Sequence, residues 1–458
     1  VDEITVKVKA LWDKLDVRYD RWAATTDPVH KKCVQGILQR LWDEKEIYKD
    51  KQAGYYSVRQ EQFLTDKERG PDGEFGPEWG TVEFREEENY YFKLSEHKDW
   101  LLAYLAGRKD AVIPDYRQTE LRNGVEKISG DLCISRPKSR LDWGIELPFD
   151  KDYVTYVWFD ALTNYISFID YDPAAVSYEL QPSSFRDKWP ALHVIGKDIL
   201  IPAHGIYWLI MLHALGFPDD AMPQLLVHGW WNLGGTKISK SAGNMIDPDA
   251  LVDKYGDDAL RYYLMSDIAT GKDADFSEDL LVQRYNSDLA NNLGNLLNRS
   301  LNMTQRYLSG QIERSDSDPT SNTVKDEAAD VVKNYGDWLN KFSADAALTA
   351  ASFLASRCNQ IIDRDAPWKM AKDESQKTKL SNLLYSLCES LRIIAILISP
   401  VLPKAAHGIF DQLNWKMELS RNDERFRLDD AKWGGLPDGH VVGKPVPLFP
   451  RIETSSAL

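Results

Sequence analysis

The segment TTDPVHKKCVQGILQRLWDEKEIY, residues 25–48, has the apolar spacing of an amphipathic helix. Its periodic apolar positions are Val34, Ile37, Leu38, Leu41 and Trp42. Asp27 is suited to cap the amino end, because its carboxylate can accept a bond from a free backbone N–H. Pro28 fits the first helical position, where no N–H is needed. We therefore expect a helix that begins at Pro28 and buries one face.

Between residues 52 and 117 the pattern changes to short segments around a loop rich in glycine and proline. The strand-like segments are GYYSVRQEQFL (54–64) and WGTVEFREEENYYFKL (79–94), and the loop is RGPDGEFGPEWG (69–80). Because glycine and proline mark turns between strands, this region predicts an insertion of β-hairpin character.

Residues 152–270 alternate apolar runs with helical stretches. The runs are YVTYVWF (153–159), LHVI (192–195) and QLLVHGW (224–230), and a helical stretch is GIYWLIMLHALG (205–216). Strands buried on both faces give such runs, so this region predicts a parallel α/β sheet. From DFSEDLL at residue 275 onward the pattern is helical, broken by the polar linker ERSDSDPTSNT (313–323), which indicates a separate helical bundle.

The composition is that of an ordinary globular protein, with 458 residues, 43% of them hydrophobic and 28% charged. No apolar run approaches the roughly 20 residues that span a bilayer, and the start, VDEITVKVKALW, lacks the features of a signal peptide. We therefore expect a cytoplasmic protein.

Charge and cysteine content exclude several classes. A net charge of −15 argues against nonspecific coating of nucleic acid, although a local basic groove is compatible with it. The four cysteines are Cys33, Cys133, Cys358 and Cys388. Because no C-x-x-C pair occurs, neither a disulfide framework nor a zinc knuckle is indicated.

One loop carries candidate chemistry. HGWWNLGGTKISKSAGN (228–244) follows an expected sheet strand and precedes MIDPDALVDKYG (245–256), where Asp247 can cap a helix that opens at Pro248. Ligands of open α/β sheets bind beyond the carboxyl ends of strands. Two lysines there suit a polyphosphate whose negative charge grows during reaction, whereas an isolated lysine-serine cluster is more often a solvated loop.

KISKS, Lys237 to Ser241, resembles the second signature of class I aminoacyl-tRNA synthetases, with Ile238 in the methionine position. Alone it leaves several amino-acid specificities open, and the related nucleotidylyltransferases too. Five further segments, in order along the chain, resemble methionyl-tRNA synthetase: CISRP (133–137), YVWFDALTNY (156–165), VIGKDIL (194–200), HGIYW (204–208) and PLFPRIE (447–453).

The resemblance implies an α/β fold with a Rossmann-type parallel-sheet catalytic domain, an inserted connective domain and an all-α anticodon-binding bundle. It places the catalytic domain in residues 1–50 and 118–275, the insertion in 51–117 and the bundle in 276–458. The activity that it implies is ATP-dependent activation of methionine to methionyl-adenylate, with Mg²⁺, and transfer to the 3′ end of methionine tRNA.

The resemblance also implies an ATP site, in which Lys237 and Lys240 are catalytic because they stabilise the departing pyrophosphate. The ATP-binding residues that it assigns are Gly196, Asp198, His228, Gly229, Lys237, Ser239, Lys240 and Ser241. Without the family, Gly196 and Asp198 would be interpreted as a capped turn at a strand end.

The methionine site must recognise an unbranched thioether, for which aromatic walls are the available means. The resemblance places Trp158, Ala161 and Tyr165 in the side-chain pocket, with His204 and Trp208 opposite. Leu162 stands where relatives often have proline, so that wall is expected to differ in shape. Taken singly, Trp158 and Trp208 are more often core residues, and His204 is more often a structural histidine with its hydrogen bonds satisfied.

Anticodon reading requires single-stranded bases stacked on aromatics and bonded by Asn or Arg. By position, the resemblance assigns the CAU anticodon to Asn295, Arg299 and Trp368. Asn295 and Arg299 are four residues apart, hence on one helix face. In the absence of the family match, an Asn/Arg pair on a helix usually belongs to a face exposed to solvent.

The chain departs from the family in two places. The connective insertion usually carries cysteines that hold zinc, and here it has none, so we expect no zinc. The first class I signature, H-x-G-H, does not occur in the sequence, and the match begins late, at VDEITVKVKALWDKL. We expect either a truncated sequence or a catalytically incomplete relative.

Two hypotheses follow. The first, which we favour because the lysine loop and the pocket aromatics are intact, is a methionine-tRNA ligase. The second is a noncatalytic tRNA-binding or regulatory protein. Under both hypotheses we expect a monomer that does not associate with a membrane.

Overall fold

A computed structural model describes residues 2–59, 62–64, 68–70, 72–238, 245–313, 319–415 and 427–453. The chain forms two compact units, one of residues Tyr19–His228 and one that combines Val1–Arg18 with Gly229–Leu458. These limits differ from the domain boundaries that the resemblance implies, and those boundaries stay a prediction.

The first unit contains the expected parallel sheet. Its strands, in the order β4 (Val112–Ile113), β10 (Gln224–His228) and β9 (Leu192–Gly196), are all parallel. The longer helical elements of this unit besides α2 (Pro28–Asp43) are α3 (Lys98–Gly107), α4 (Asp115–Glu126), α5 (Val157–Ser167), η6 (Leu200–Trp208) and α7 (Leu209–Ala214), of which α4 contacts β4 and η6 contacts β10. The runs LHVI and QLLVHGW are thus confirmed as parallel strands.

Two details of the strand prediction are wrong. Burial alternates along β9, where Leu192 and Val194 remain 42% and 62% exposed, so this strand is not buried on both faces. The run YVTYVWF is not a strand of the parallel sheet. Its first residues end β8 (Asp150–Thr155), and the rest opens α5. A short apolar run does not distinguish a strand from a buried helix, which explains the error.

Strand β8 belongs to a small antiparallel sheet with β6 (Ser135–Pro137) and β7 (Glu146–Leu147). The remaining short elements of this unit are η2 (Pro77–Trp79), η3 (Leu94–His97), η4 (Tyr178–Leu180), α6 (Ser183–Arg186), η5 (Lys197–Ile199) and η7 (Asp219–Ala221).

Helix α2 (Pro28–Asp43) confirms the first prediction. The Asp27 carboxylate accepts a hydrogen bond from the Val29 backbone N–H at 2.8 Å. Of the five expected apolar positions, four are buried, and Trp42 is half-buried at the edge of the same core.

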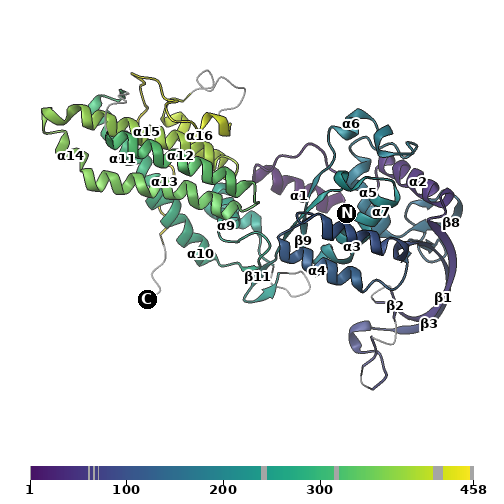
Figure 1. Ribbon diagram of the computed structural model, residues 1–458. Helices are drawn as coiled ribbons and strands as arrows, with labels where there is room; N and C mark the ends of the chain where they lie inside the picture. The colour runs from purple at the N-terminus through teal and green to yellow at the C-terminus, as the bar shows by residue number, and fades with distance from the viewer. Residues whose placement is uncertain are drawn as a thin grey trace. The chain divides into compact units, whose positions relative to one another are not determined.

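The insertion is a β-hairpin, as expected. Strands β1 (Ile47–Ser57) and β3 (Val82–Phe92) pair antiparallel along their whole lengths, and β2 (Gln62–Leu64) and β5 (Leu132–Cys133) add to the same sheet (Figure 1). Ile47 and Phe92, at the base of the hairpin, are buried in the core of this unit. The hairpin therefore begins at Ile47, a few residues before the expected start.

The second unit begins with α1 (Asp2–Lys14), whose Lys14 ammonium pairs with Asp249 at 3.0 Å and Asp253 at 2.7 Å. A three-stranded sheet has the order β12 (Thr236–Lys237), β11 (Trp231–Leu233) and β13 (Ala274–Asp275). The helices that follow or flank it are α8 (Pro248–Tyr255), α9 (Asp257–Ser266) and α10 (Glu278–Arg284).

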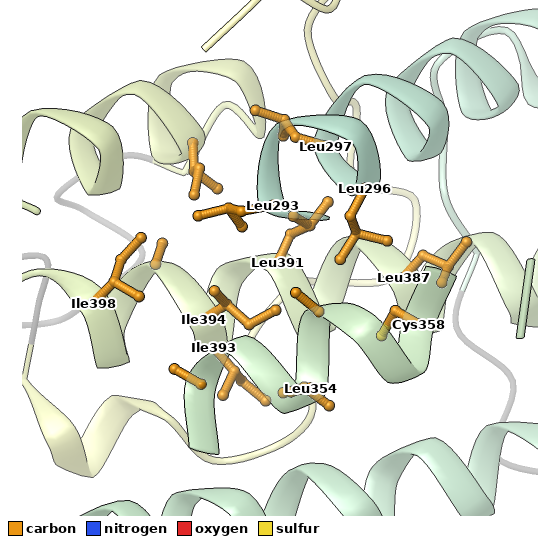
Figure 2. Close-up of a cluster of buried hydrophobic side chains, with 14 of the residues drawn as sticks. Leu293, Leu296, Leu297, Leu354, Cys358, Leu387, Leu391, Ile393, Ile394 and Ile398 are labelled. Carbon is orange, nitrogen blue, oxygen red and sulfur yellow. The ribbon is translucent and has the colours of Figure 1, made fainter. Parts of the chain in front are cut away.

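The expected helical bundle is confirmed. Its elements are η9 (Tyr285–Gly294), α11 (Asn295–Leu308), α12 (Pro319–Leu339), α13 (Ala344–Asp365), α14 (Pro367–Met370), η10 (Glu374–Gln376), α15 (Lys377–Ile398), α16 (Pro403–Gln412) and η11 (Leu428–Asp430). Leucine, isoleucine and cysteine side chains from η9, α11, α13 and α15 meet in its core (Figure 2). The end of the expected linker, PTSNT, is the start of α12, and residues 314–318 lie outside the described residues.

The segment Glu374–Ile398 is long and apolar enough to cross a membrane, which the sequence analysis did not anticipate. Its apolar window is buried entirely inside the bundle. Within α15, Glu389 and Arg392 form a fully buried ion pair with an Nη2–Oε1 distance of 2.7 Å. Such a helix is typical of a protein core as well as of a membrane.

Candidate functional site

Helix α5 presents one face to a cluster of aromatic and histidine side chains. Trp158, Ala161 and Tyr165 recur at intervals of three and four residues, so they share this face, and each is half-buried. Leu162 points instead into the core and is 2% exposed. The structure thus separates Leu162 from the three residues expected beside it.

Tyr165 and His204 form a hydrogen-bonded pair. The Tyr165 hydroxyl lies 2.8 Å from His204 Nε2, and His204 Nδ1 lies 2.9 Å from the Ile199 carbonyl oxygen. Because a carbonyl only accepts, Nδ1 carries the proton and Nε2 of the neutral ring accepts from Tyr165. Burial lowers the pKa of His204, which favours this neutral form.

His193, on β9, completes the cluster, and the sequence analysis missed it. Its ring lies 4.1 Å from that of Tyr165 between centroids, and its Nε2 accepts a hydrogen bond from Trp208 Nε1 at 3.0 Å. Burial, followed by the neighbouring His204, lowers the pKa of His193 to about 3. The alternation of LHVI, which places His193 on the same face as the buried Ile195, was the available signal.

This cluster therefore presents aromatic and imidazole groups without net charge. Trp208 is fully buried beneath it, and its ring centroid lies 5.8 Å from that of Tyr165. Such a surface favours an apolar or thioether side chain over a charged one, because no group here compensates a buried charge.

A second histidine holds α5 in place. His30, on α2 and fully buried, has Nδ1 2.8 Å from Ser167 Oγ and Nε2 2.8 Å from Asp160 Oδ1. Asp160 lies in the first turn of α5, and Ser167 is its last residue. The pair of bonds fixes the rotation of α5 about its axis, and hence the direction of the Trp158 and Tyr165 face.

The residues of this unit that were predicted to bind ATP lie at the carboxyl ends of β9 and β10. Gly196 and His228 are register partners, and Asp198 lies in η5, directly after β9. A Cβ at Gly196 would lie 2.7 Å from Asp198 Oδ1. A larger residue at Gly196 would therefore displace the Asp198 carboxylate from the strand end, and the assignment of both residues to a nucleotide stays a prediction.

The lysine segment belongs to the second unit and differs from the expected loop. Its first part is a hairpin in which β11 and β12 pair antiparallel across Gly234 and Gly235, with φ of 58° and 74°. A two-residue turn with both φ positive is the turn that glycine pairs favour between strands, so Lys237 lies on β12. The side chain of Lys237 and the residues Ser239, Lys240 and Ser241 lie outside the described residues.

Close packing surrounds the start of this segment. A Cβ at Gly229 would lie 2.0 Å from the Lys272 carbonyl oxygen, so only glycine fits there. After the segment, α8 begins as predicted, with the Asp247 carboxylate accepting from the Asp249 N–H at 3.0 Å.

Asn295 and Arg299 form a ladder of polar contacts with α13. Asn295 Nδ2 donates to Asn359 Oδ1 at 3.1 Å, and Arg299 Nη2 donates to Asp363 Oδ1 at 2.5 Å. Both residues are half-buried on one face of α11, as the spacing predicted. Trp368, on the short α14 that follows α13, is 42% exposed. Asn359 and Asp363 were not predicted as partners, although their own spacing of four residues mirrors that of Asn295 and Arg299.

Within the described ranges, no group of three or more His, Cys, Asp or Glu side chains could hold a metal ion. Burial raises the pKa of the Cys33, Cys358 and Cys388 thiols to about 12, so these cysteines are protonated core residues.

Comparison with known families gives two matches. Residues 1–72 and 79–301 match the family described as tRNA synthetases class I (M), and residues 313–457 match the anticodon binding domain of methionyl tRNA ligase. Together the two matches cover most of the chain.

Curated relatives are similar over the whole chain. The methionine–tRNA ligase of Lactococcus lactis subsp. lactis is 38% identical over 99% of this chain and 68% of that protein. That of Caldanaerobacter subterraneus subsp. tengcongensis is 39% identical over 100% of this chain and 69% of that protein. The chain thus spans about two thirds of the length of each.

Solved structures share the fold. Mycobacterium tuberculosis methionyl-tRNA synthetase in complex with methionyl-adenylate superimposes with a TM-score of 0.86 at 33% identity, covering 97% of this chain and 85% of that one. The apo form of the same enzyme gives a TM-score of 0.85 at 31% identity, covering 99% and 88%.

Proposed function

The chain belongs to the methionyl-tRNA synthetase family, and we propose that it activates methionine with ATP and transfers it to tRNA. The observation that carries the proposal is the uncharged cluster of Tyr165, His193, His204 and Trp208 against one face of α5. An unbranched thioether offers only apolar and weak polar contacts, and aromatic rings with fixed neutral imidazoles supply both.

In this proposal Trp158, Ala161 and Tyr165 contact the methionine side chain, and His204 holds the Tyr165 hydroxyl in place. Leu162 and Trp208 act from behind as core residues that support the wall. The measurement that tests this assignment is methionine binding by calorimetry, compared with binding of leucine and glutamate. Equal affinity for all three amino acids would rule out a methionine pocket at this face.

ATP activation of a carboxylate proceeds by in-line attack on the α-phosphate, and the protein contributes mainly positioning and charge stabilisation. We assign Gly196 and Asp198 to the adenosine, with the Asp198 carboxylate accepting from a ribose hydroxyl, and His228 and Gly229 to the nucleotide. Support for the first pair is the close approach that Gly196 permits at the strand end.

Lys237 and Lys240, with Ser239 and Ser241, are proposed to hold the pyrophosphate as it leaves. In a version of the protein that also carries the first class I signature, Lys240→Ala should then slow methionyl-adenylate formation by about a hundredfold or more with little change in methionine affinity, because one charge contact is worth a few kcal/mol at the transition state. An unchanged rate of methionine-dependent pyrophosphate exchange in that variant would refute the assignment.

Mg²⁺ enters this proposal with ATP, whose phosphate oxygens are its ordinary ligands. No zinc is proposed, because the insertion that carries zinc in relatives has no cysteine here. Elemental analysis of purified protein should find far less than one zinc per chain, and one zinc per chain would overturn this part.

We further propose that Asn295, Arg299 and Trp368 read the CAU anticodon. Arg299 is held by Asp363 and Asn295 by Asn359, so their polar groups are oriented before RNA binds. The exposed indole of Trp368 offers a stacking surface. A methionine tRNA with a changed anticodon should bind more weakly than the CAU form.

A noncatalytic tRNA-binding role is the second candidate, because residues 313–457 match an anticodon binding domain, which can bind tRNA whether or not an adenylate forms. Pyrophosphate exchange and tRNA binding by the 458-residue chain distinguish the two. Exchange at a useful rate supports the ligase, whereas CAU-selective tRNA binding without exchange favours the second candidate for this chain. We propose a monomer located in the cytoplasm, which sedimentation and cell fractionation would test.

A further inference from the structure

A groove between α12 and α13 lies outside every site described above. The two helices run side by side in the bundle (Figure 1), and the groove is lined by residues of these helices alone. The residues of α12 that line the groove run from Glu327 to Trp338. At 1.5 Å per residue this stretch is about 16 Å long, or about three helical turns.

The groove has large apolar side chains that the bundle leaves partly exposed. Trp338 from α12 and Phe353 from α13 are 40% and 57% exposed, and Val331 and Ala350 lie with them in the lining. Aromatic side chains exposed together in a concave surface are typical of binding sites, where covering them supplies much of the affinity.

Uncompensated carboxylates accompany the apolar lining. Asp330 and Asp345 form no ion pair with any described residue, whereas the nearby Glu327 is neutralised by Arg357, with Nε–Oε distances of 3.0 and 3.1 Å. Lys341, whose Nζ lies 5.1 Å from the centroid of the Trp338 ring, offsets part of this charge, so Asp330, Asp345 and Lys341 together leave a charge of −1 at the groove. Such charge repels the phosphate backbone of RNA and attracts Lys or Arg.

We propose that this groove binds an amphipathic, basic helix of a partner protein. Apolar side chains at intervals of three and four residues contact Trp338 and Phe353, and Lys or Arg side chains on the flanks pair with Asp330 and Asp345. A helix fits because the groove is about three turns long and lies between two helices. A second copy of the chain fits less well, because two bodies of charge −15 repel each other.

The test uses the whole chain and a labelled synthetic peptide of about 16 residues. In this peptide Leu recurs every three or four residues along one helix face, and Lys occupies the positions that flank this face. Fluorescence anisotropy should show saturable binding that weakens about tenfold in Phe353→Ala and several-fold in Asp330→Asn. Hydrogen exchange should show peptide-dependent protection of α12 and α13. Both side chains are exposed, so these variants should fold normally, which circular dichroism checks.

Asp337→Asn is the matched control, since Asp337 is an exposed carboxylate on α12 that does not line the groove. Equal weakening in Asp337→Asn and Asp330→Asn would show general attraction to an acidic protein and overturn the proposal. Equal binding of a peptide with Glu in place of Lys would do the same. If Phe353→Ala instead weakens tRNA binding, or abolishes self-association in sedimentation, the occupant is RNA or a second copy, and the proposal is wrong.

Discussion

Single polar atoms determine the character of the proposed methionine wall. His204 Nδ1 donates its proton to the backbone carbonyl of Ile199, and this bond leaves Nε2 to accept from Tyr165. His193 Nε2 accepts from the indole N–H of Trp208, so the proton of the neutral ring lies on Nδ1. Each imidazole is neutral because burial disfavours its charged form, so the wall stays uncharged across the physiological pH range.

Tyr165→Phe removes one hydroxyl from this wall and leaves the ring. We expect methionine to bind about 3- to 10-fold more weakly, because His204 Nε2 loses its donor and a buried unmet acceptor costs roughly 1 kcal/mol or more. Calorimetry with methionine measures the change. Tyr178→Phe is the control, since Tyr178 packs on Phe185 and Phe217 instead, and a similar loss there would contradict the specific role of Tyr165.

In the second unit, buried carboxylates link separate elements by accepting hydrogen bonds from backbone N–H groups. At the amino end of α9, Asp258 Oδ2 accepts from the Ala405 N–H of α16 at 2.7 Å, while its Oδ1 has no partner among the described residues. Within the bundle, the Glu389 carboxylate accepts from the backbone N–H groups of Gly434, Gly435 and Leu436. The first contact holds α16 to α9, and the second holds residues 434–436 to α15.

The first prediction at this scale concerns pH. Burial, with a smaller contribution from Asp257, raises the pKa of Asp258 from its ordinary 3.8 to about 6. Because the folded state binds this proton more tightly than the unfolded state, the contribution of Asp258 to stability falls as pH rises from about 4 to 6. The loss is constant above pH 6 and amounts to about 3 kcal/mol at most.

Asp258→Asn should remove this fall, so that the variant loses less stability than the parent between pH 4 and 6. Urea denaturation at several pH values, followed by circular dichroism, measures it. Asp337→Asn, at an exposed position, should leave the pH profile unchanged. Parallel profiles for Asp258→Asn and the parent would show that Asp258 does not titrate in this range.

The second prediction concerns the buried pair in α15. Glu389→Ala removes the carboxylate that pairs with Arg392 and accepts from three backbone N–H groups. The fully buried guanidinium then keeps the carbonyls of Asp430 and Lys432 but loses this countercharge. We expect the free energy of unfolding to fall by about 3–5 kcal/mol. Glu374→Ala removes an exposed ion pair with Lys377 at 3.4 Å and should cost less than about 0.5 kcal/mol. Similar costs for both variants would mean that Glu389 does not anchor the carboxyl-terminal segment.

At the scale of the whole molecule, the helical bundle is a continuous apolar core with its polar ladder and exposed indole on the outside. The core comes from several helices, and α15 lies almost wholly within it (Figure 2). A rigid support of this kind keeps Asn295 and Arg299 in place on α11, so recognition of RNA by the bundle should not depend on adenylate chemistry.

Trp368→Ala should therefore weaken binding of CAU methionine tRNA by about 1–3 kcal/mol, because one stacking platform is lost. Filter binding at several salt concentrations measures it, and the salt dependence should stay the same because no phosphate contact changes. Trp143→Ala, which removes an indole that is 74% exposed in the first unit, is the control for general loss of surface aromatics. If both variants bind like the parent, the anticodon assignment of Trp368 is wrong.

The sequence by itself determined the features that depend on local chemistry. Asp27 and Asp247 cap the helices that begin at Pro28 and Pro248, and the spacing of Asn295 and Arg299 places them on one helix face. Such features involve neighbouring residues, so the backbone geometry alone fixes them. The family resemblance rested likewise on short ordered segments.

Tertiary structure alone decided which distant residues meet. His193 joins Tyr165, His30 joins Asp160, and Asn359 joins Asn295 only after strands and helices far apart in sequence pack together. The same packing turned half of YVTYVWF into helix and placed Lys237 on a strand, because an apolar run or a glycine pair is compatible with more than one local structure. What each segment becomes then depends on the surface it must cover, and that surface is built by the rest of the chain.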